Sequence, residues 1–259
     1  MQNKKVYIVL IVILFIFFFI MFFAFGVENI LREDDQLILL VGDHTIWTYQ
    51  NNRWDEVSLN SDIEKLNWQE YEVFSDNQKL GSYYLWHDDK WYAFDQDKSS
   101  VSLPGSLLAY QSNYEVSLAS FQEEEIGSTS YIEKVLTSYN LSPKSRLTSS
   151  SKVVLDFDQD GKMEEFYAIS NAFSTEFKPD VIFSLAFMVK DNSIYMIYED
   201  VGNTYFDACR PFFRSFINVD YDLPYEVILG CGGYSRENEV NSLYQFSNNS
   251  FKTLISSNN

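Results

Sequence analysis

One acidic loop of this sequence carries side chains whose type and spacing could hold a metal ion. Residues 156–164 read DFDQDGKME, so carboxylates stand at positions 1, 3, 5 and 9 of the loop. These acids are Asp156, Asp158, Asp160 and Glu164. They can converge on one cation if the chain turns sharply at Gly161, and the backbone carbonyl of Lys162 can add a further ligand. Hard oxygen ligands in a flexible loop suit Ca²⁺, and the sequence therefore predicts calcium here.

The alternative for this loop is an acidic turn held by Asx hydrogen bonds without metal. We favour the metal because closely spaced carboxylates repel one another and a calcium ion removes that repulsion. An EF-hand is excluded because position 12 of the loop is Tyr167 instead of Glu. The flanking runs VVL and EFYAI predict strands on both sides of the loop instead of helices.

This strand–DxDxDGxx[DE]–strand segment resembles the calcium loops of FG-GAP and VCBS-type repeats, which are found in β-propellers of cell-surface proteins. The resemblance implies a propeller-like arrangement of repeated sheets. It also implies calcium ligation by Asp156, Asp158, Asp160, the Lys162 carbonyl and Glu164. A second segment at 216–233 keeps Asp220, Asp222 and Glu226 but has Pro224 where the Asp-Gly turn should be, so no metal is predicted there.

The elements around the loop read as hairpins. Apolar or aromatic runs alternate with short turns of Asn, Asp and Ser, residues that tolerate positive φ and bond to their own backbone. Segments of this kind occupy residues 45–57, 83–94, 107–117, 184–198 and 242–254. In the C-terminal half an acidic loop segment followed by a hairpin occurs twice, which favours a repeated sheet unit. Helix is sparse, and the best candidate is Tyr131–Tyr139 with a capping box formed by Ser130 and Glu133.

An uninterrupted apolar run fills residues 6–26. As a helix it is long enough to cross a hydrocarbon core, and Lys4 and Lys5 before it favour a cytoplasmic N-terminus. A cleaved signal peptide is the alternative, which the length of the run disfavours. The predicted fold is therefore all-β, mostly antiparallel hairpins in propeller-like repeats, preceded by one N-terminal transmembrane helix.

Polar segments divide the rest of the chain. The predicted parts are a cytoplasmic tail (1–5), a transmembrane anchor (6–26), a linker (27–36), a β-rich N-terminal half (37–141), a Ser-rich linker (142–152) and a β-rich C-terminal half with the calcium-type loop (153–259).

The net charge bears on which partners the protein could bind, and the two cysteines bear on whether it contains a disulfide. The formal net charge of −18 disfavours binding to nucleic acid phosphates. Cys209 and Cys231 can form a disulfide outside the cytoplasm, and two buried free thiols are the equal alternative.

Other residues that could do chemistry are weaker candidates. His44 and His87 are the two histidines, and neither has metal-ligand spacing, so both are expected to be structural. Several tryptophans could form a platform for stacking sugars, although cross-strand packing is the expected role. These tryptophans are Trp47, Trp54, Trp86 and Trp91.

The function predicted from the sequence is that of a membrane-anchored extracytoplasmic binding protein. Residues 6–26 would hold it in the cell membrane, and a calcium-stabilised β domain would bind a protein or glycan partner. The alternative is an extracytoplasmic hydrolase, such as a glycosidase that uses paired carboxylates, for which Glu164 and Glu165 are an example.

Overall fold

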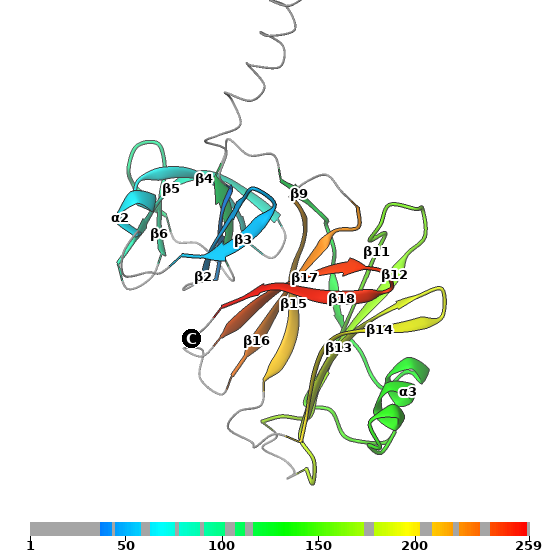
Figure 1. Cartoon of the computed structure of the whole chain (residues 1–259). Coiled ribbons are helices and arrows are strands. Elements are labelled where there is room, and N and C mark those ends of the chain that lie inside the picture. The colour runs from blue at the N-terminus through cyan, green and yellow to red at the C-terminus, as the bar shows by residue number, and fades with distance from the viewer. Residues whose placement is uncertain are drawn as a thin grey trace, which may run out of the picture. The chain divides into compact units, whose positions relative to one another are not determined.

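The computed structural model describes most of the chain beyond residue 36. The described ranges are 37–42, 45–57, 63–75, 78–88, 91–101, 107–111, 116–173, 179–202, 209–219, 223–233 and 239–257. Across these ranges the chain is built mostly of antiparallel strands, which confirms the predicted β-rich class (Figure 1). None of the helices in these ranges has the length and apolar content needed to span a membrane. The predicted anchor at 6–26 lies outside the described residues.

The first sheet has eight strands in the order β3-β2-β1-β8-β4-β5-β6-β7. Its strands are β1 (Leu37–Val41), β2 (Thr45–Gln50), β3 (Arg53–Glu56), β4 (Gln69–Ser75), β5 (Gln78–His87), β6 (Trp91–Phe94), β7 (Ser100–Val101) and β8 (Leu107–Gln111). The short helix α2 (Ile63–Leu66) precedes β4.

Two five-stranded sheets follow, and each contains four strands that pair in chain order. One sheet has the order β10-β11-β12-β13-β14, and the other has the order β18-β17-β16-β15-β9. The strands of the first are β10 (Glu123–Glu125), β11 (Ser149–Leu155), β12 (Glu164–Ser170), β13 (Phe183–Lys190) and β14 (Ser193–Val201). The strands of the second are β9 (Ser117–Leu118), β15 (Arg210–Asn218), β16 (Glu226–Gly232), β17 (Val240–Ser247) and β18 (Ser250–Ser256). The helix α3 (Ser130–Ser138) lies between β10 and β11 in the chain.

Four of the five predicted hairpins are present, as β2–β3, β5–β6, β13–β14 and β17–β18. Three of them turn on residue pairs in which both φ angles are positive, as two-residue turns of the I′ type require. These pairs are Asn51-Asn52, Asp191-Asn192 and Asn248-Asn249. Asn and Asp adopt this conformation at low cost, which explains why these turns could be read from the sequence.

The hairpin predicted at 107–117 is wrong. Strand β8 pairs with β1 and β4, whereas β9 pairs with β15 of another sheet. Both edges of β8 are thereby occupied, and turn residues alone do not specify a strand's partner. The predicted linker at 142–152 also differs from the structure, because Ser149–Lys152 belong to β11. A run of serines has no alternation of apolar and polar residues, so it gave no strand signal.

The main core lies between the two five-stranded sheets. Alternate residues of β12 and β13 face this core, and they meet apolar side chains from β15, β16 and β17. Fully or nearly fully buried members include Phe157, Phe166, Met188, Phe216 and Val227. The opposite face of β12 and β13 packs against Ile132, Val135 and Leu136 of α3, so the sheet of β10–β14 is buried on both faces.

The predicted start of α3 is wrong by one residue. The N-cap is Thr129, whose Oγ1 accepts a hydrogen bond from the backbone N–H of Ile132. Ser130 is the first helical residue, so Ser130 and Glu133 do not form a capping box. Two adjacent hydroxyl residues fit the N-cap pattern equally well in the sequence, and burial of Ile132 against the sheet selects the register.

The two segments predicted to be copies occupy corresponding strands. Residues 152–170 with the hairpin 184–198 fall on β11–β14, and residues 216–233 with the hairpin 242–254 fall on β15–β18. In each case an acidic loop joins the first two strands and a turn with two positive φ angles joins the last two. A repeat relation between the two units stays a prediction.

Candidate metal centre

The acidic loop connects β11 to β12 and is fixed to the core by Phe157. This ring is fully buried and contacts the rings of four other phenylalanines, namely Phe166, Phe216, Phe246 and Phe251. The backbone carbonyl of Phe157 accepts a hydrogen bond from the N–H of Tyr225 at 3.2 Å. Because Phe157 points into the core, the aspartates on either side of it are directed away from the core.

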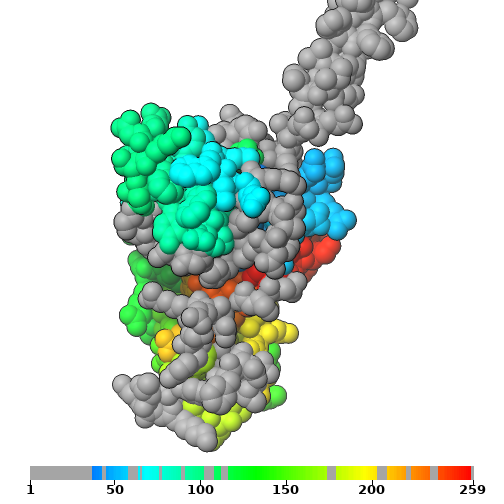
Figure 2. All heavy atoms as spheres, turned by 90° about the vertical axis from the view of Figure 1, so that its left-hand side faces the viewer, coloured from blue at the N-terminus to red at the C-terminus, as the bar shows by residue number. Residues whose placement is uncertain are grey.

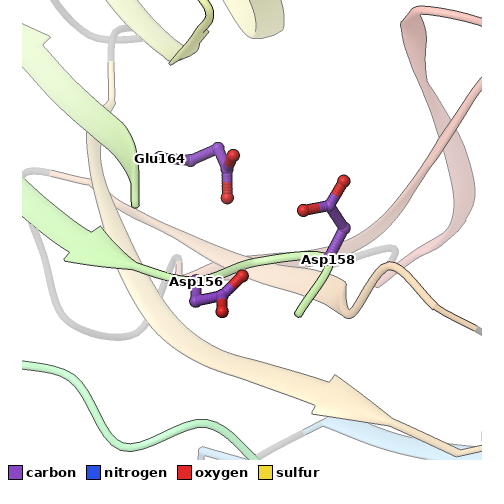
Figure 3. Close-up of side chains that lie close together, drawn as sticks. All are labelled: Asp156, Asp158 and Glu164. Carbon is purple, nitrogen blue, oxygen red and sulfur yellow. The ribbon is translucent and has the colours of Figure 1, made fainter. Parts of the chain in front are cut away.

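Three predicted ligands come together. Asp156, Asp158 and Glu164 each offer one carboxylate oxygen, and these oxygens lie within 4.8 Å of one another. Figure 3 shows the three carboxylates turned toward one shared space. Glu164 is almost fully buried at 1% exposure, although it carries a carboxylate at the first position of β12. A buried carboxylate requires a counter-charge and hydrogen bonds, so this group is the centre of the candidate site.

Backbone hydrogen bonds set the shape of the loop. Gly161 donates its N–H to Asp156 Oδ2 at 3.0 Å, and Phe157 donates its N–H to Glu164 Oε2 at 2.9 Å. The chain reverses through positive φ angles at Gln159 (56°) and Gly161 (86°). The predicted sharp turn at Gly161 is therefore present, and glycine adopts this conformation without a Cβ penalty.

Asp160 lies outside the three-carboxylate group. Its Oδ1 accepts a hydrogen bond from the backbone N–H of Lys162 at 2.8 Å. This bond holds the pKa of the Asp160 carboxyl below its usual value, and the charges of Lys190 and Lys162 act in the same direction. The side chain of Lys162 forms an exposed ion pair with Asp191 at 3.2 Å.

Lys190, which is not among the residues predicted for the site, lies beside the acidic loop. Its ammonium lies 2.5 Å from Asp158 Oδ2, 3.0 Å from Glu164 Oε1 and 3.6 Å from Asp160 Oδ2. Burial by itself lowers the pKa of Lys190, but the hydrogen bonds to Asp158 and Glu164 outweigh that effect and raise the pKa above its ordinary value. Lys190 precedes a predicted turn, but nothing in the sequence indicates that this turn lies beside the acidic loop.

The donor set consists of carboxylate oxygens, which are hard ligands of the kind that calcium takes in proteins. One oxygen each of Asp156 and Asp158, the Oδ1 atom in both cases, is buried and accepts no hydrogen bond within the described part of the chain. An unsatisfied buried carboxylate oxygen is costly, and a hard cation satisfies several such oxygens at once. Residues that would hold the ion are Asp156, Asp158 and Glu164.

The histidine and the glutamate pair considered as other candidate sites have partners that indicate structural roles. His87 packs against Trp91 across β5 and β6, with ring centroids 4.9 Å apart. Glu164 and Glu165 are consecutive strand residues with separate partners, since Glu165 pairs with Lys152 at 2.5 Å, so they do not face each other across a substrate site. His44, Asp220 and Asp222 lie outside the described residues.

Aromatic side chains gather on one face of the eight-stranded sheet at β5 and β6. Tyr84 pairs with Phe94 and Trp86 with Tyr92 in the strand register, and all four are half-buried. Trp68 packs on Phe94 with centroids 4.9 Å apart and is 49% exposed. The opposite face at these strands is core, with Leu85, Trp91 and Ala93 buried. Figure 2 shows the surface of this part of the sheet in cyan to blue-green.

The tryptophans predicted either to pack across strands or to stack sugars differ in where they lie. Trp47 and Trp91 are buried, and Trp54 packs across strands on Tyr49 at 5.0 Å, as expected for cross-strand packing. Trp86 also packs across strands, on Tyr92 at 5.7 Å, but it lies on the half-exposed face. Trp68 is not among the predicted tryptophans, and its positive φ of 62° is an unusual backbone conformation for a large residue.

Cys209 and Cys231 form a disulfide with a Cα–Cα distance of 5.3 Å. Of the two alternatives left open by the sequence, the structure selects the bond. It ties the segment before β15 to β16, and Cys209 is buried.

A scan against protein-family models finds no match, and searches of the curated proteins and of the solved structures also find none.

Proposed function

We propose that this chain is a membrane-anchored extracytoplasmic binding protein that takes up a glycan on the aromatic face of its eight-stranded sheet and is stabilised by calcium. The observation that carries the binding role is the half-exposed face formed by Trp68, Tyr84, Trp86, Tyr92 and Phe94. Exposed apolar patches are a feature of interaction sites, and Trp and Tyr are enriched among the residues that dominate binding energy.

Two features of the face favour a glycan over a protein partner. Flat rings such as Trp68 and Trp86 offer π surfaces against which the C–H faces of sugar rings can stack. The exposed carboxylate of Glu70, which pairs with Tyr84 in the register, can accept hydrogen bonds from sugar hydroxyls.

A glycan array probed with the full-length chain in detergent tests the binding role. Trp68→Ala and Trp86→Ala should each abolish the signal that the unchanged chain gives. Trp54→Ala is the matched control, because Trp54 is half-buried in the same sheet but packs on Tyr49, and it should bind normally. Equal binding by all variants would contradict the proposal. In a separate pull-down, a protein captured by the unchanged chain but not by Trp68→Ala or Trp86→Ala would show that the partner is a protein instead of a glycan.

The calcium role is supported by the converging carboxylates and by the buried Oδ1 atoms of Asp156 and Asp158. An ion that binds only the folded state raises its stability, by about 2.7 kcal/mol at a hundredfold excess over the dissociation constant. The melting temperature should therefore rise with calcium and fall with chelator, and Asp156→Ala should remove the response. Magnesium should substitute poorly, because it demands a tighter octahedron. If calorimetry detected no calcium binding at millimolar concentrations, the calcium role would be ruled out.

The location outside the cytoplasm is supported by the disulfide, which persists in oxidising compartments, and by the apolar run at 6–26. Protease added to intact cells should remove the C-terminal part and leave the N-terminus protected. A protected C-terminal part would refute the predicted orientation.

The relation to FG-GAP and VCBS-type repeats is part of the same proposal. It is supported by two four-stranded units, β11–β14 and β15–β18. Each unit has an acidic loop after its first strand. On this proposal they are propeller-like sheets, and only the first has kept the acidic loop intact.

A further inference from the structure

Lys190 enters the acidic loop from a neighbouring hairpin. It is the last residue of β13, directly before the Asp191-Asn192 turn that leads into β14. Side chains of a strand alternate between faces, so Lys190 shares its face with Met188, which points into the core between the two sheets. Its side chain is 17% exposed, so the ammonium has exchanged most of its water for carboxylate oxygens.

The ammonium and a calcium ion would use the same carboxylates. Lys190 contacts Asp158 Oδ2 and Glu164 Oε1, and these two acids are also members of the converging group. Calcium needs six to eight oxygens at about 2.3–2.6 Å, so it would have to take these carboxylates over. Two cations that share carboxylates also repel each other strongly in a partly buried site. The ammonium and the ion therefore exclude each other.

Lys190 has a route out of the site. Asp191 and Asn192, the turn residues that follow it, are both exposed. The four-carbon stem of a lysine lets its ammonium reach solvent while the backbone stays in the strand. The ion pair between Lys162 and Asp191 is exposed on both sides, with 65% and 62% of the side chains accessible, so it offers little resistance to such a movement.

We propose that Lys190 is a tethered counter-ion, which holds the acidic loop together in the calcium-free protein and is expelled when calcium binds. This inference rests on the calcium role proposed above and adds its regulation. The lysine lowers the apparent calcium affinity, so the loop fills only where calcium is abundant, and it keeps the loop folded where calcium is scarce.

Calcium titration by calorimetry on the full-length chain in detergent tests the competition. Lys190→Met keeps the apolar stem and removes the charge, and it should bind calcium at least tenfold more tightly than the unchanged chain. Lys152→Met is the matched control. Lys152 lies in the same sheet, is 22% exposed and pairs with Glu165, so its removal changes the net charge equally without touching the loop. In chelator, Lys190→Met should melt at a lower temperature than the control, and calcium should restore it.

A second measurement needs no variant. An amine-acylating reagent followed by mass spectrometry reports how accessible each lysine is. Lys190 should be protected in chelator and become reactive in saturating calcium chloride, whereas the reactivity of Lys152 should stay constant. Unchanged reactivity of Lys190 under calcium would overturn the expulsion.

The possible outcomes separate this inference from the calcium role. Equal calcium affinity of Lys190→Met and the unchanged chain overturns the inference and leaves the calcium role intact. Binding by Lys190→Met alone would show that calcium does not displace Lys190 from the unchanged chain, and it overturns both the calcium role and the expulsion. Absence of binding by every variant overturns both.

Discussion

At the scale of single residues, Phe157 connects the acidic loop to the core. Its ring is fully buried among four other phenylalanines, while its N–H and carbonyl bond to Glu164 and Tyr225. One apolar residue stands between two aspartates in this loop. Its ring therefore packs in the core while the two carboxylates face the candidate site.

Phe157→Ala should destabilise the protein by about 3–5 kcal/mol, because it removes a large buried ring and leaves a cavity. Met163→Ala is the control in the same loop. Met163 is 69% exposed, so its truncation should change stability by less than about 0.5 kcal/mol. Chemical denaturation followed by circular dichroism measures both values, and similar midpoints for the two variants would contradict this role of Phe157.

At the scale of elements, α3 shows how a helix is placed by its cap and its buried face together. Thr129 satisfies the N–H of Ile132, and Ile132, Val135 and Leu136 pack against the sheet of β10–β14. The cap and the buried positions agree in register only if the helix starts at Ser130, as it does.

Thr129→Ala should therefore cost about 1 kcal/mol of stability through loss of the N-cap. Ser130→Ala, at the neighbouring position that the sequence pattern favoured, should change stability by less than about 0.5 kcal/mol. Thermal melts of both variants distinguish the two positions. A larger loss from Ser130→Ala would mean that the helix starts one residue later.

At the scale of the whole molecule, a buried polar group joins the eight-stranded sheet to the sheet of β15–β18. Arg214 is 6% exposed and donates from Nε to Asn241 Oδ1 at 3.0 Å, and it also pairs with Glu239. Asn241 in turn donates to Thr45 Oγ1 of β2 at 3.2 Å. One amide side chain thereby satisfies partners from both sheets.

Asn241→Ala should cost about 1–3 kcal/mol per buried partner that it leaves unsatisfied. Gln245→Ala, four residues further along β17 and half-buried, is the control and should have a small effect. Urea denaturation of both variants gives the comparison. Equal stability of the two variants would show that the Arg214–Asn241–Thr45 chain contributes nothing.

The disulfide acts at the same scale, because it ties β16 to the segment before β15, 22 residues away in the chain. Reduction with dithiothreitol should lower the free energy of unfolding by about 3 kcal/mol on the chain-entropy model. The double variant Cys209→Ala/Cys231→Ala should be destabilised without reductant and should not respond to it. A response of the double variant would show that the reductant acts elsewhere.

Local chemistry explains what the sequence by itself determined. Asn and Asp pairs predicted the turns at 51–52, 191–192 and 248–249, because positive φ is a property of the residues themselves. The spacing of acids in the 156–164 loop predicted that Asp156, Asp158 and Glu164 converge, because the chain turns at Gly161 within the same loop, but it also included Asp160, which lies outside this group. Apolar and aromatic runs on either side of short polar turns predicted four of the hairpins, because these turns are also specified locally.

Only the tertiary structure decided which strands pair and which distant side chain enters the site. Nothing local assigns β9 to β15 or places Lys190 among carboxylates that lie 26 to 32 residues away in the chain. The face on which Trp68 meets Phe94 likewise depends on strand order. Such contacts form only when the burial of two faces fixes sheet register and packing together, and the free energy that selects them is spread over the whole core.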